Sequence, residues 1–524
     1  RLFSNPPKLN IIALQDSQPE RLEAFSQDLA STGIAQTDLK ELLDLFEHSS
    51  TFGSLIQIPA AFAKKLSDLE TKLNTAAASG DIFSQQSAQE LLTLVQQAKL
   101  LAKQYDAVIA NPPYMGGKGM NPALKDFAKK KFPDSKSDLF AMFIERGFAW
   151  CKNSGFNSMV TMQSWMFLSS YEAMREKILQ DRTIQTMAHL GARAFPEISG
   201  EVVQATAFVM QGTHLNGFKP VFFRLVDTTQ DSKEVELQAG LNRFDSTIQD
   251  DFKKIPGSPV AYWVSSKVRE IFEKQTLLSS YSQAKLGMRT GDNNKWLRLW
   301  YETSLSDCYF KASNAHEVIS SEKKWFPYNK GGDFRKWYGN NDYLIYWYNN
   351  GHDIKEETLE KYPQLSWDNL GWKITNERNF FEKSITWSFI SSSNFGVRCS
   401  LGGAIFDVAG SSIFPKADDY PLLASFLCSK LAFEFLKVLN PTLNFQAINI
   451  NNLPIIRPDE DVKERVNDLI QISKKDWDSY ETSWDFTQNP IIRTNQPNLE
   501  QAFNTWQQQN ADAVAEMKRL EEEN

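Results

Sequence analysis

The residues best suited to chemistry are Asn111, Pro112, Pro113 and Tyr114, which follow one another directly. The run 106–110 (DAVIA) before them predicts a buried strand, and a glycine-rich stretch follows. In open α/β sheets, ligands bind beyond the carboxyl ends of strands, which is where this motif is expected. The prolines fix φ and hold the preceding residue extended, so the Asn111 side chain and the Pro112 carbonyl point in fixed directions.

This arrangement suits methyl transfer to an exocyclic amine of a nucleic-acid base. An Asn side-chain oxygen and a carbonyl can accept both protons of such an amine, and Tyr114 offers a ring for stacking. The two hydrogen bonds draw the nitrogen lone pair out of the ring system, so the motif acts by positioning and electrostatics. The target base has to leave the duplex to reach such a pocket.

The alternative is a Pro-Pro turn that ends a strand beside a chance aromatic. The chain contains its own comparison, Asn5-Pro6-Pro7-Lys8, which lacks the aromatic and precedes a strand expected at 8–15. Cytosine C5 methylation is excluded because it needs a Pro-Cys nucleophile. The residues before the four cysteines are Trp150, Asp307, Arg398 and Leu427.

The elements around the motif predict an α/β fold. Residues 18–48 and 58–104 have helical periodicity, and strands are expected near 158–162, 183–190, 203–210 and 220–226. This alternation ends near 226. We therefore divide the chain into 1–226, a linker at 227–280, an aromatic-rich region at 281–457 and a polar helical tail at 458–524.

The aromatic-rich region is the candidate DNA-binding surface. Residues 281–350 hold 16 aromatics and 10 Lys or Arg against 7 acids, a composition that suits phosphate contacts and base reading. Most of the aromatics are expected to be core, and a plain β-rich domain is the alternative. The candidate DNA contacts are Arg289, Asn293, Asn294, Lys295, Lys323, Lys324, Lys330, Arg335, Lys336, Asn394 and Arg398.

Charge and composition narrow the remaining classes. The net charge of −7 is carried by residues 459–524, which have 15 acids and 7 basic residues, so the other 458 residues sum to +1. The sequence has no unbroken apolar run of membrane-helix length. Cys151, Cys308, Cys399 and Cys428 form no C-x-x-C pair, and H-E-x-x-H is absent. We expect a cytoplasmic protein with no metal and no membrane contact.

The sequence resembles the PglX family of adenine-specific DNA methyltransferases in BREX phage-defence systems, which is related to type IIG restriction–modification enzymes. The stretches that carry the resemblance span the chain. They are YDAVIANPPYMGGKGMN (105–121), SDLFAMFIERGFAWCKNSGF (137–156), GMRTGDNNKWLR (287–298), WFPYNKGGDFRKWYGN (325–340) and NPTLNFQAINI (440–450) followed by NNLPII (451–456).

The resemblance implies a Rossmann-like class I methyltransferase domain with a helical insertion at about 57–104, a mixed α/β target-recognition domain at 281–457 and a helical spacer. It implies that Asn111, Pro112, Pro113 and Tyr114 are the catalytic motif and that Phe195 is a second aromatic of the base pocket. It places Phe52 at a contact with the adenine of S-adenosylmethionine. The chain has no G-x-G-x-x-G, so we expect a fragment whose cofactor residues lie mostly upstream of Arg1.

The expected partners are double-stranded DNA with a specific recognition site and other BREX components. One alternative is a type IIG-like restriction–modification enzyme, since Pro458-Asp459 with Asp461-Val462-Lys463 superficially resembles a PD…(D/E)xK nuclease site. Another is that this fragment is a non-catalytic DNA-recognition or partner-docking module. Enzymes that methylate a protein glutamine also carry NPPY, but they lack a large recognition region such as 281–457.

Overall fold

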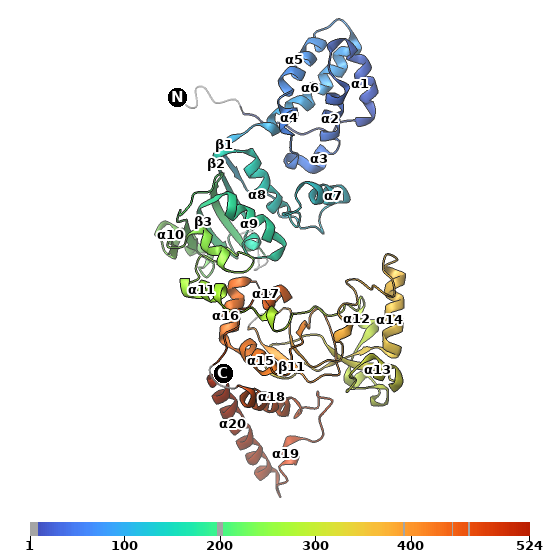
Figure 1. Cartoon of the computed structure of the whole chain (residues 1–524), viewed down its shortest axis with the longest axis vertical. Helices are drawn as coiled ribbons and strands as arrows, with labels where there is room; N and C mark the ends of the chain where they lie inside the picture. Colours follow the sequence, from blue (N-terminus) through green and yellow to red (C-terminus); the bar gives the residue numbers. More distant parts are fainter. Residues whose placement is uncertain (1–8, 196–202, 391–393, 443, 459–461) are drawn as a thin grey trace. The chain divides into compact units, whose positions relative to one another are not determined.

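The chain forms two compact units, 1–253 and 254–524, in a computed structural model that describes all residues except 1–8, 196–202, 391–393, 443 and 459–461. Each unit has its own helices and strands (Figure 1). Each also has its own core of buried apolar side chains. Both units mix helices with strands, so the expected α/β class is confirmed at that level.

The first unit begins with a helical lobe, drawn in blue in Figure 1. Its apolar side chains at 3–4 spacing, such as Leu39, Leu42 and Phe46, are buried in a core shared by the helices. The helices of the lobe are α1 (Leu22–Asp28), α2 (Gln36–Phe46), α3 (Ser49–Phe52), α4 (Ala60–Ala63), α5 (Leu66–Ala77) and α6 (Ile82–Ala102). The helical character expected at 18–48 and 58–104 is confirmed.

A six-stranded sheet follows, with the order β1-β2-β4-β3-β5-β6. β1, β2, β3 and β5 run in one direction, whereas β4 and β6 run in the other. The carboxyl ends of β1, β2 and β3 therefore share one edge of the sheet. The strands are β1 (Tyr105–Ala110), β2 (Cys151–Met162), β3 (Thr183–Gly191), β4 (Ala205–Gln211), β5 (Val221–Arg224) and β6 (Arg243–Phe244).

The connection from β1 to its parallel neighbour β2 ends in helix α8 (Leu139–Trp150), which packs against β2. Its contact is close at Gly147, where a Cβ atom would lie 2.6 Å from the Asn157 side-chain oxygen and from the Met159 methyl group. The other helices of this part of the unit are α7 (Pro122–Lys131), α9 (Glu172–Asp181) and α10 (Lys233–Gln238).

The second unit carries two small sheets, ordered β11-β10-β13 and β12-β8-β9-β7. Their strands are β7 (Leu297–Leu299), β8 (Trp325–Asn329), β9 (Tyr343–Tyr346), β10 (Ser384–Trp387), β11 (Val397–Ser400), β12 (Ile405–Phe406) and β13 (Ser412–Ile413). The helices are α11 (Ser266–Lys274), α12 (Asn293–Trp296), α13 (Ala315–Ser321), α14 (Tyr348–Lys361), α15 (Tyr420–Cys428), α16 (Lys430–Leu439), α17 (Ala447–Asn451), α18 (Lys463–Trp477), α19 (Pro490–Arg493) and α20 (Leu499–Glu523).

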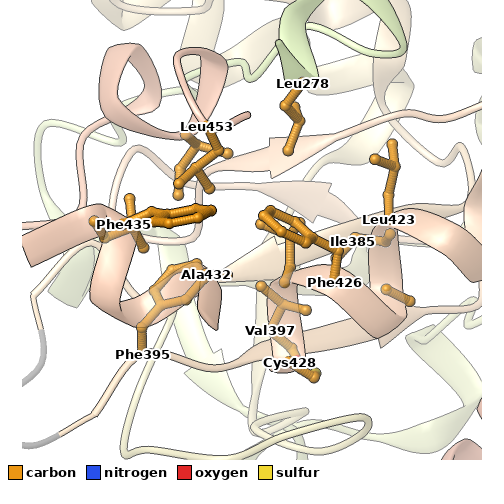
Figure 2. Close-up of a cluster of buried hydrophobic side chains, with 14 of the residues drawn as sticks. Leu278, Ile385, Phe395, Val397, Leu423, Phe426, Cys428, Ala432, Phe435 and Leu453 are labelled. Atoms are coloured by element: carbon orange, nitrogen blue, oxygen red, sulfur yellow. The ribbon is translucent and has the colours of Figure 1, made fainter. Parts of the chain in front are cut away.

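The main core of this unit brings together segments that lie far apart in the sequence. Figure 2 shows Leu278, Ile385 from β10 and Phe435 from α16 among its side chains. The same core also contains Val466 and Leu520 from α18 and α20. The helical tail is therefore part of the second unit and is not a separate body.

The structure corrects two expectations about the chain's organisation. Residues 9–15 form no strand, and Leu9 and Ile11 are 71% and 83% exposed. The expected linker 227–280 is also wrong as a separate element. β6 pairs with β5 in the first unit, and Phe272 of α11 lies in the core of the second.

Candidate active site

The motif Asn111–Tyr114 lies where the sequence predicts, immediately after β1. β2 runs parallel to β1 and pairs with it through Ala110 and Met159, so both strands deliver their carboxyl ends to this edge. Pro112 is buried, whereas Asn111 and Pro113 are exposed. The rigid Pro-Pro backbone is thus anchored at Pro112 and presents Asn111 to solvent.

The hydrogen-bonding groups of the motif are not used within the described part of the chain. The Asn111 side chain and the Pro112 carbonyl make no hydrogen bond to any described residue. A side-chain amide oxygen and a backbone carbonyl that both lack partners among the described residues can accept the two protons of a ligand amine.

Tyr114, the last residue of the motif, is half-buried. Its ring meets Phe140 edge to face, with 6.0 Å between centroids, and its buried hydroxyl has no hydrogen-bond partner among the described residues. Burial, helped by the negative charge of Asp138, raises the pKa of Tyr114 above its usual value. The hydroxyl therefore stays protonated at neutral pH.

Asp138, which the sequence analysis missed, connects the motif to α8. One of its carboxylate oxygens accepts the Met115 amide at 2.9 Å and caps α8 at the Phe140 amide at 3.3 Å. Burial raises the pKa of Asp138 despite these bonds. The Met115 carbonyl accepts the Leu139 amide at 3.2 Å, so the residue after Tyr114 is held on both sides.

An aromatic layer lies behind Tyr114. Phe140 from the first turn of α8 contacts Tyr171, with 5.7 Å between ring centroids, and both side chains are buried. The apolar residues of 139–148 recur at helical spacing, which indicates that Phe140 faces a core. Nothing in the sequence links Phe140 to Tyr171.

The two aromatics implied by resemblance have different surroundings. Phe195 is half-buried and follows β3 by four residues, so it lies at the same edge of the sheet as the motif. Two strands separate β3 from β1, which spaces them roughly 14 Å apart. Phe52 stacks on Phe127 of α7 with 4.2 Å between centroids. Their roles remain proposals.

His189 in β3 is structural, as its isolation in the sequence suggests. It is buried and its Nε2 lies 2.6 Å from the Gln163 side-chain oxygen. Burial lowers the pKa of His189 to about 3, so the ring is neutral at physiological pH.

The candidate DNA contacts at 289–295 lie in the second unit, Arg289 in a loop and Asn293, Asn294 and Lys295 in the short helix α12 that follows it. Arg289 is half-buried and donates to the Trp372 carbonyl at 2.7 Å, and Asn293 accepts a hydrogen bond from Thr290. Asn294 is exposed. Lys295 pairs with Glu357 of α14, so its charge is already balanced.

The basic run 323–336 is also largely engaged inside the unit. Lys323 donates to the Ser306 carbonyl at 2.5 Å, and Lys330 lies 4.9 Å from the centroid of the Tyr343 ring. The other three pair with acids at 2.5–4.0 Å: Lys324 with Asp307, Arg335 with Asp476, and Lys336 with Glu521. The structure thus keeps these residues in one unit but does not gather them into a single unpaired patch.

Arg398 requires a correction, because the structure does not offer it to DNA. It lies in β11, is 3% exposed, and donates to the Ser388 hydroxyl at 3.3 Å. Burial lowers its pKa to about 10. Asn394 is exposed and stays a candidate, whereas Arg398 serves the interior of the unit.

The described residues of the sheet edge form a place where the amine group of a ligand could be received. Unused acceptors at Asn111 and Pro112 and the aromatic surface at Tyr114 have the right chemistry for it. Over the described ranges, no three His, Cys, Asp or Glu residues are placed to hold a metal ion. The nuclease-like residues 459–461 lie outside the described residues. No described helix is long and apolar enough to cross a membrane.

Comparison with known proteins gives relatives along the whole chain. The family model of the Eco57I restriction-modification methylase matches residues 20–195. The adenine-specific methyltransferase BrxX of Escherichia coli O9:H4 (strain HS) is 40% identical over 94% of this chain. The adenine-specific methyltransferase PglX of Lacticaseibacillus casei (strain Zhang) is 39% identical over 96% of it.

The chain spans about two fifths of each of these relatives, 41% of BrxX and 42% of PglX. Among solved structures, the type IIL restriction–modification enzyme MmeI in complex with DNA gives a TM-score of 0.47 at 13% identity, covering 97% of this chain and 75% of that chain. By sequence, the chain is similar over nearly its whole length to the adenine-specific methyltransferases BrxX and PglX.

Proposed function

We propose that the protein containing this chain transfers a methyl group to the N6 atom of adenine in double-stranded DNA at a specific site, marking host DNA in a BREX phage-defence system. The observation that carries the proposal is the post-strand Asn111-Pro112-Pro113-Tyr114 with unused acceptors, in a chain 40% identical to an adenine-specific methyltransferase.

The geometry suggests what each group does. Asn111 and the Pro112 carbonyl accept the two N6 protons, which localises the nitrogen lone pair and aims it away from the base plane. Tyr114 supplies a ring face against the flipped base, and its packing on Phe140 limits its rotation. Phe195 is proposed as the second aromatic of this pocket. No covalent intermediate is needed.

S-adenosylmethionine supplies the methyl group when it is bound. The present residues fit the acceptor side of such a reaction, and Phe52 remains a proposed contact for the cofactor's adenine. The finer fold assignment belongs to the same proposal: a Rossmann-like methyltransferase domain with its helical insertion, a target-recognition domain around 281–457 and a helical spacer. In that recognition domain, Arg289, Asn294, Lys330 and Asn394 are proposed DNA contacts. Asn294 and Asn394 are exposed, and Arg289 and Lys330 form no ion pair with a described acid.

The test is the Asn111→Ala variant of the full-length protein. Methylation of plasmid DNA is measured as the incorporation of a labelled methyl group. Loss of one acceptor should reduce the rate by at least about 100-fold, as for other preorganised hydrogen-bonding groups, while DNA binding by gel shift is retained. Asn5→Ala is the matched control because Asn5 begins the same tripeptide without the aromatic. Unchanged methylation in the Asn111 variant would refute the assignment.

A further inference from the structure

A lysine-rich loop leaves the Asn111–Tyr114 motif and returns to it. We call residues 117–137 the lysine loop. It holds Lys118, Lys125, Lys129, Lys130, Lys131 and Lys136 against two acids, Asp126 and Asp134, so its net charge is +4 in a chain of net charge −7. None of these lysines is among the candidate DNA contacts named from the sequence.

The two ends of the lysine loop are fastened to each other beside Tyr114. The Gly117 amide donates to the Ser137 carbonyl at 3.2 Å, and Gly116 and Asp138 form an antiparallel bridge. Asp138 also accepts the Met115 amide. We call these paired segments, 115–117 and 137–138, the neck of the loop. Because the neck starts one residue after Tyr114, the lysines have a fixed connection to the proposed catalytic motif.

Helix α7 gives the lysine loop a defined outer face. Asn121 caps the helix at the Leu124 amide at 2.8 Å, and Leu124, Ala128 and the following Phe132 are buried. Lys129, Lys130 and Lys131 occupy its last turn and are exposed, as are Lys118 and Lys136. The packing thus presents the ammonium groups to solvent.

The charges of the lysine loop are mostly unbalanced. Asp126 pairs with Lys129 at 3.4 Å, and Asp134 pairs with Lys177 of α9. The other five lysines have no ion pair with any described residue. The predicted cations of the second unit differ, since four of them already pair with acids.

A structural explanation covers only half of these lysines. Cations in the last turn stabilise a helix through its dipole, which accounts for Lys129, Lys130 and Lys131. Lys118 and Lys136 lie outside α7, and Lys125 lies in its first half. The unpaired lysines repel one another, and a bound anion would offset this repulsion.

We propose that the lysine loop binds backbone phosphates of the DNA next to the adenine that enters the site, an inference that rests on the proposed function. Lysine is a compact point charge that contacts phosphates without reading base edges. The loop would therefore fix the position of the strand at the catalytic motif, while sequence is read elsewhere. DNA is favoured over an acidic protein because the neck joins the lysines to the site that receives the base.

The experiment uses the full-length protein with Lys118, Lys130 and Lys131 all changed to Gln, and a fluorescent duplex of mixed sequence. Affinity is measured from low to high salt. Each phosphate contact contributes about 0.9 to the slope of log affinity against log salt, so the slope should become shallower by about 2 to 3. The same three residues changed to Arg should keep the slope.

The matched control is Lys64→Gln with Lys219→Gln, two exposed lysines of the same unit that also lack ion pairs with described residues. This variant should keep the wild-type slope. An unchanged slope in the triple Gln variant, with its thermal melt intact, overturns the proposal. The proposal is also overturned if the variant loses binding to an acidic protein but keeps wild-type binding to DNA. If the full-length protein fails to methylate but the slope still falls, the proposed function is refuted and the phosphate contact stands.

Discussion

At the scale of residues, the Asn111–Tyr114 motif is held by a carboxylate that lies 24 positions beyond Tyr114. Asp138 holds the Met115 amide and also caps α8, so one side chain fixes both the exit of the motif and the helix that packs behind it. This makes Asp138 a positioning residue, because its contacts reach the motif and not a reacting atom.

Asp138→Ala removes both the cap of α8 and the hydrogen bond to the Met115 amide, and its effect on methylation should exceed its effect on stability. Loss of the N-cap costs about 1 kcal/mol, and release of Met115 should lower methylation at least about tenfold in the full-length protein, since small misplacements of reacting groups are costly. Asp138→Asn retains an oxygen acceptor for both amides and should restore most of the rate. Methyl-transfer kinetics and thermal melts of both variants check this.

The chain offers a matched control for that prediction. Asp81 caps α6 in the same unit, accepting the Phe83 and Ser84 amides. Asp81→Ala should lower the melting temperature but leave methylation unchanged. If Asp81→Ala and Asp138→Ala impair methylation equally, Asp138 has no special role at the motif.

Residue types and local order were sufficient to predict the Asn111–Tyr114 motif, because its prolines and its preceding strand are adjacent in sequence. The partner Asp138 could not be predicted, because its contact with Met115 depends on how the lysine loop closes. The prediction of Arg398 as a DNA contact was wrong for a different reason. A polar sequence does not report burial, and Arg398 faces the interior of its unit.

At the scale of elements, the motif keeps its place because α8 lies close against β2. Gly147 permits this approach, and the buried Asn157 amide donates to the Ile144 carbonyl of α8 at 3.1 Å. A helix that had to move outward would shift its own N-terminus, where Asp138 and Phe140 meet the motif.

Gly147→Ala should therefore destabilise the first unit by about 1–3 kcal/mol, the usual cost of overpacking a close contact. Its Cβ atom would meet the Asn157 side chain at 2.6–2.7 Å. Gly80→Ala, between α5 and α6, is the control, since nothing lies within 4 Å of a Cβ atom there. Urea denaturation compares the two variants; equal midpoints would contradict the packing argument.

Several elements could be predicted from periodicity alone, including β3, β4 and β5 within a few residues of their ends. The prediction of a strand at 8–15 was wrong, because a short apolar run does not show whether a neighbouring strand is there to pair with it. β2 was longer than expected, since its first half, 151–157, is polar in sequence.

At the scale of the whole chain, the division into units follows core packing and not composition. The aromatic region and the polar tail differ in composition, yet Val466, Leu469 and Leu520 of the tail lie in the same core as Ile385 of β10. Lys336 and Trp337 also bond to Glu521 of α20. These long-range contacts could not be predicted, because the residues that make them lie more than 80 positions apart in the sequence.

We expect residues 254–524 to fold cooperatively and residues 254–457 not to fold. Removal of the tail exposes a core that buries Val466, Leu469, Ile470 and Leu520, each worth about 1.5–3 kcal/mol. Their sum is comparable to the whole stability of a typical domain. Circular dichroism and thermal melts of the two fragments test this, and a cooperative melt of 254–457 would show that the tail is dispensable.

The position of β1 in its sheet has a consequence for handling the molecule. Among the described strands, β1 is hydrogen-bonded to β2 alone, and Ile109 on it is 82% exposed. An open edge with an exposed β-branched residue is a template for pairing with another chain. We therefore expect the isolated 524-residue chain to self-associate through β1 during purification, and Ile109→Lys to improve its solubility.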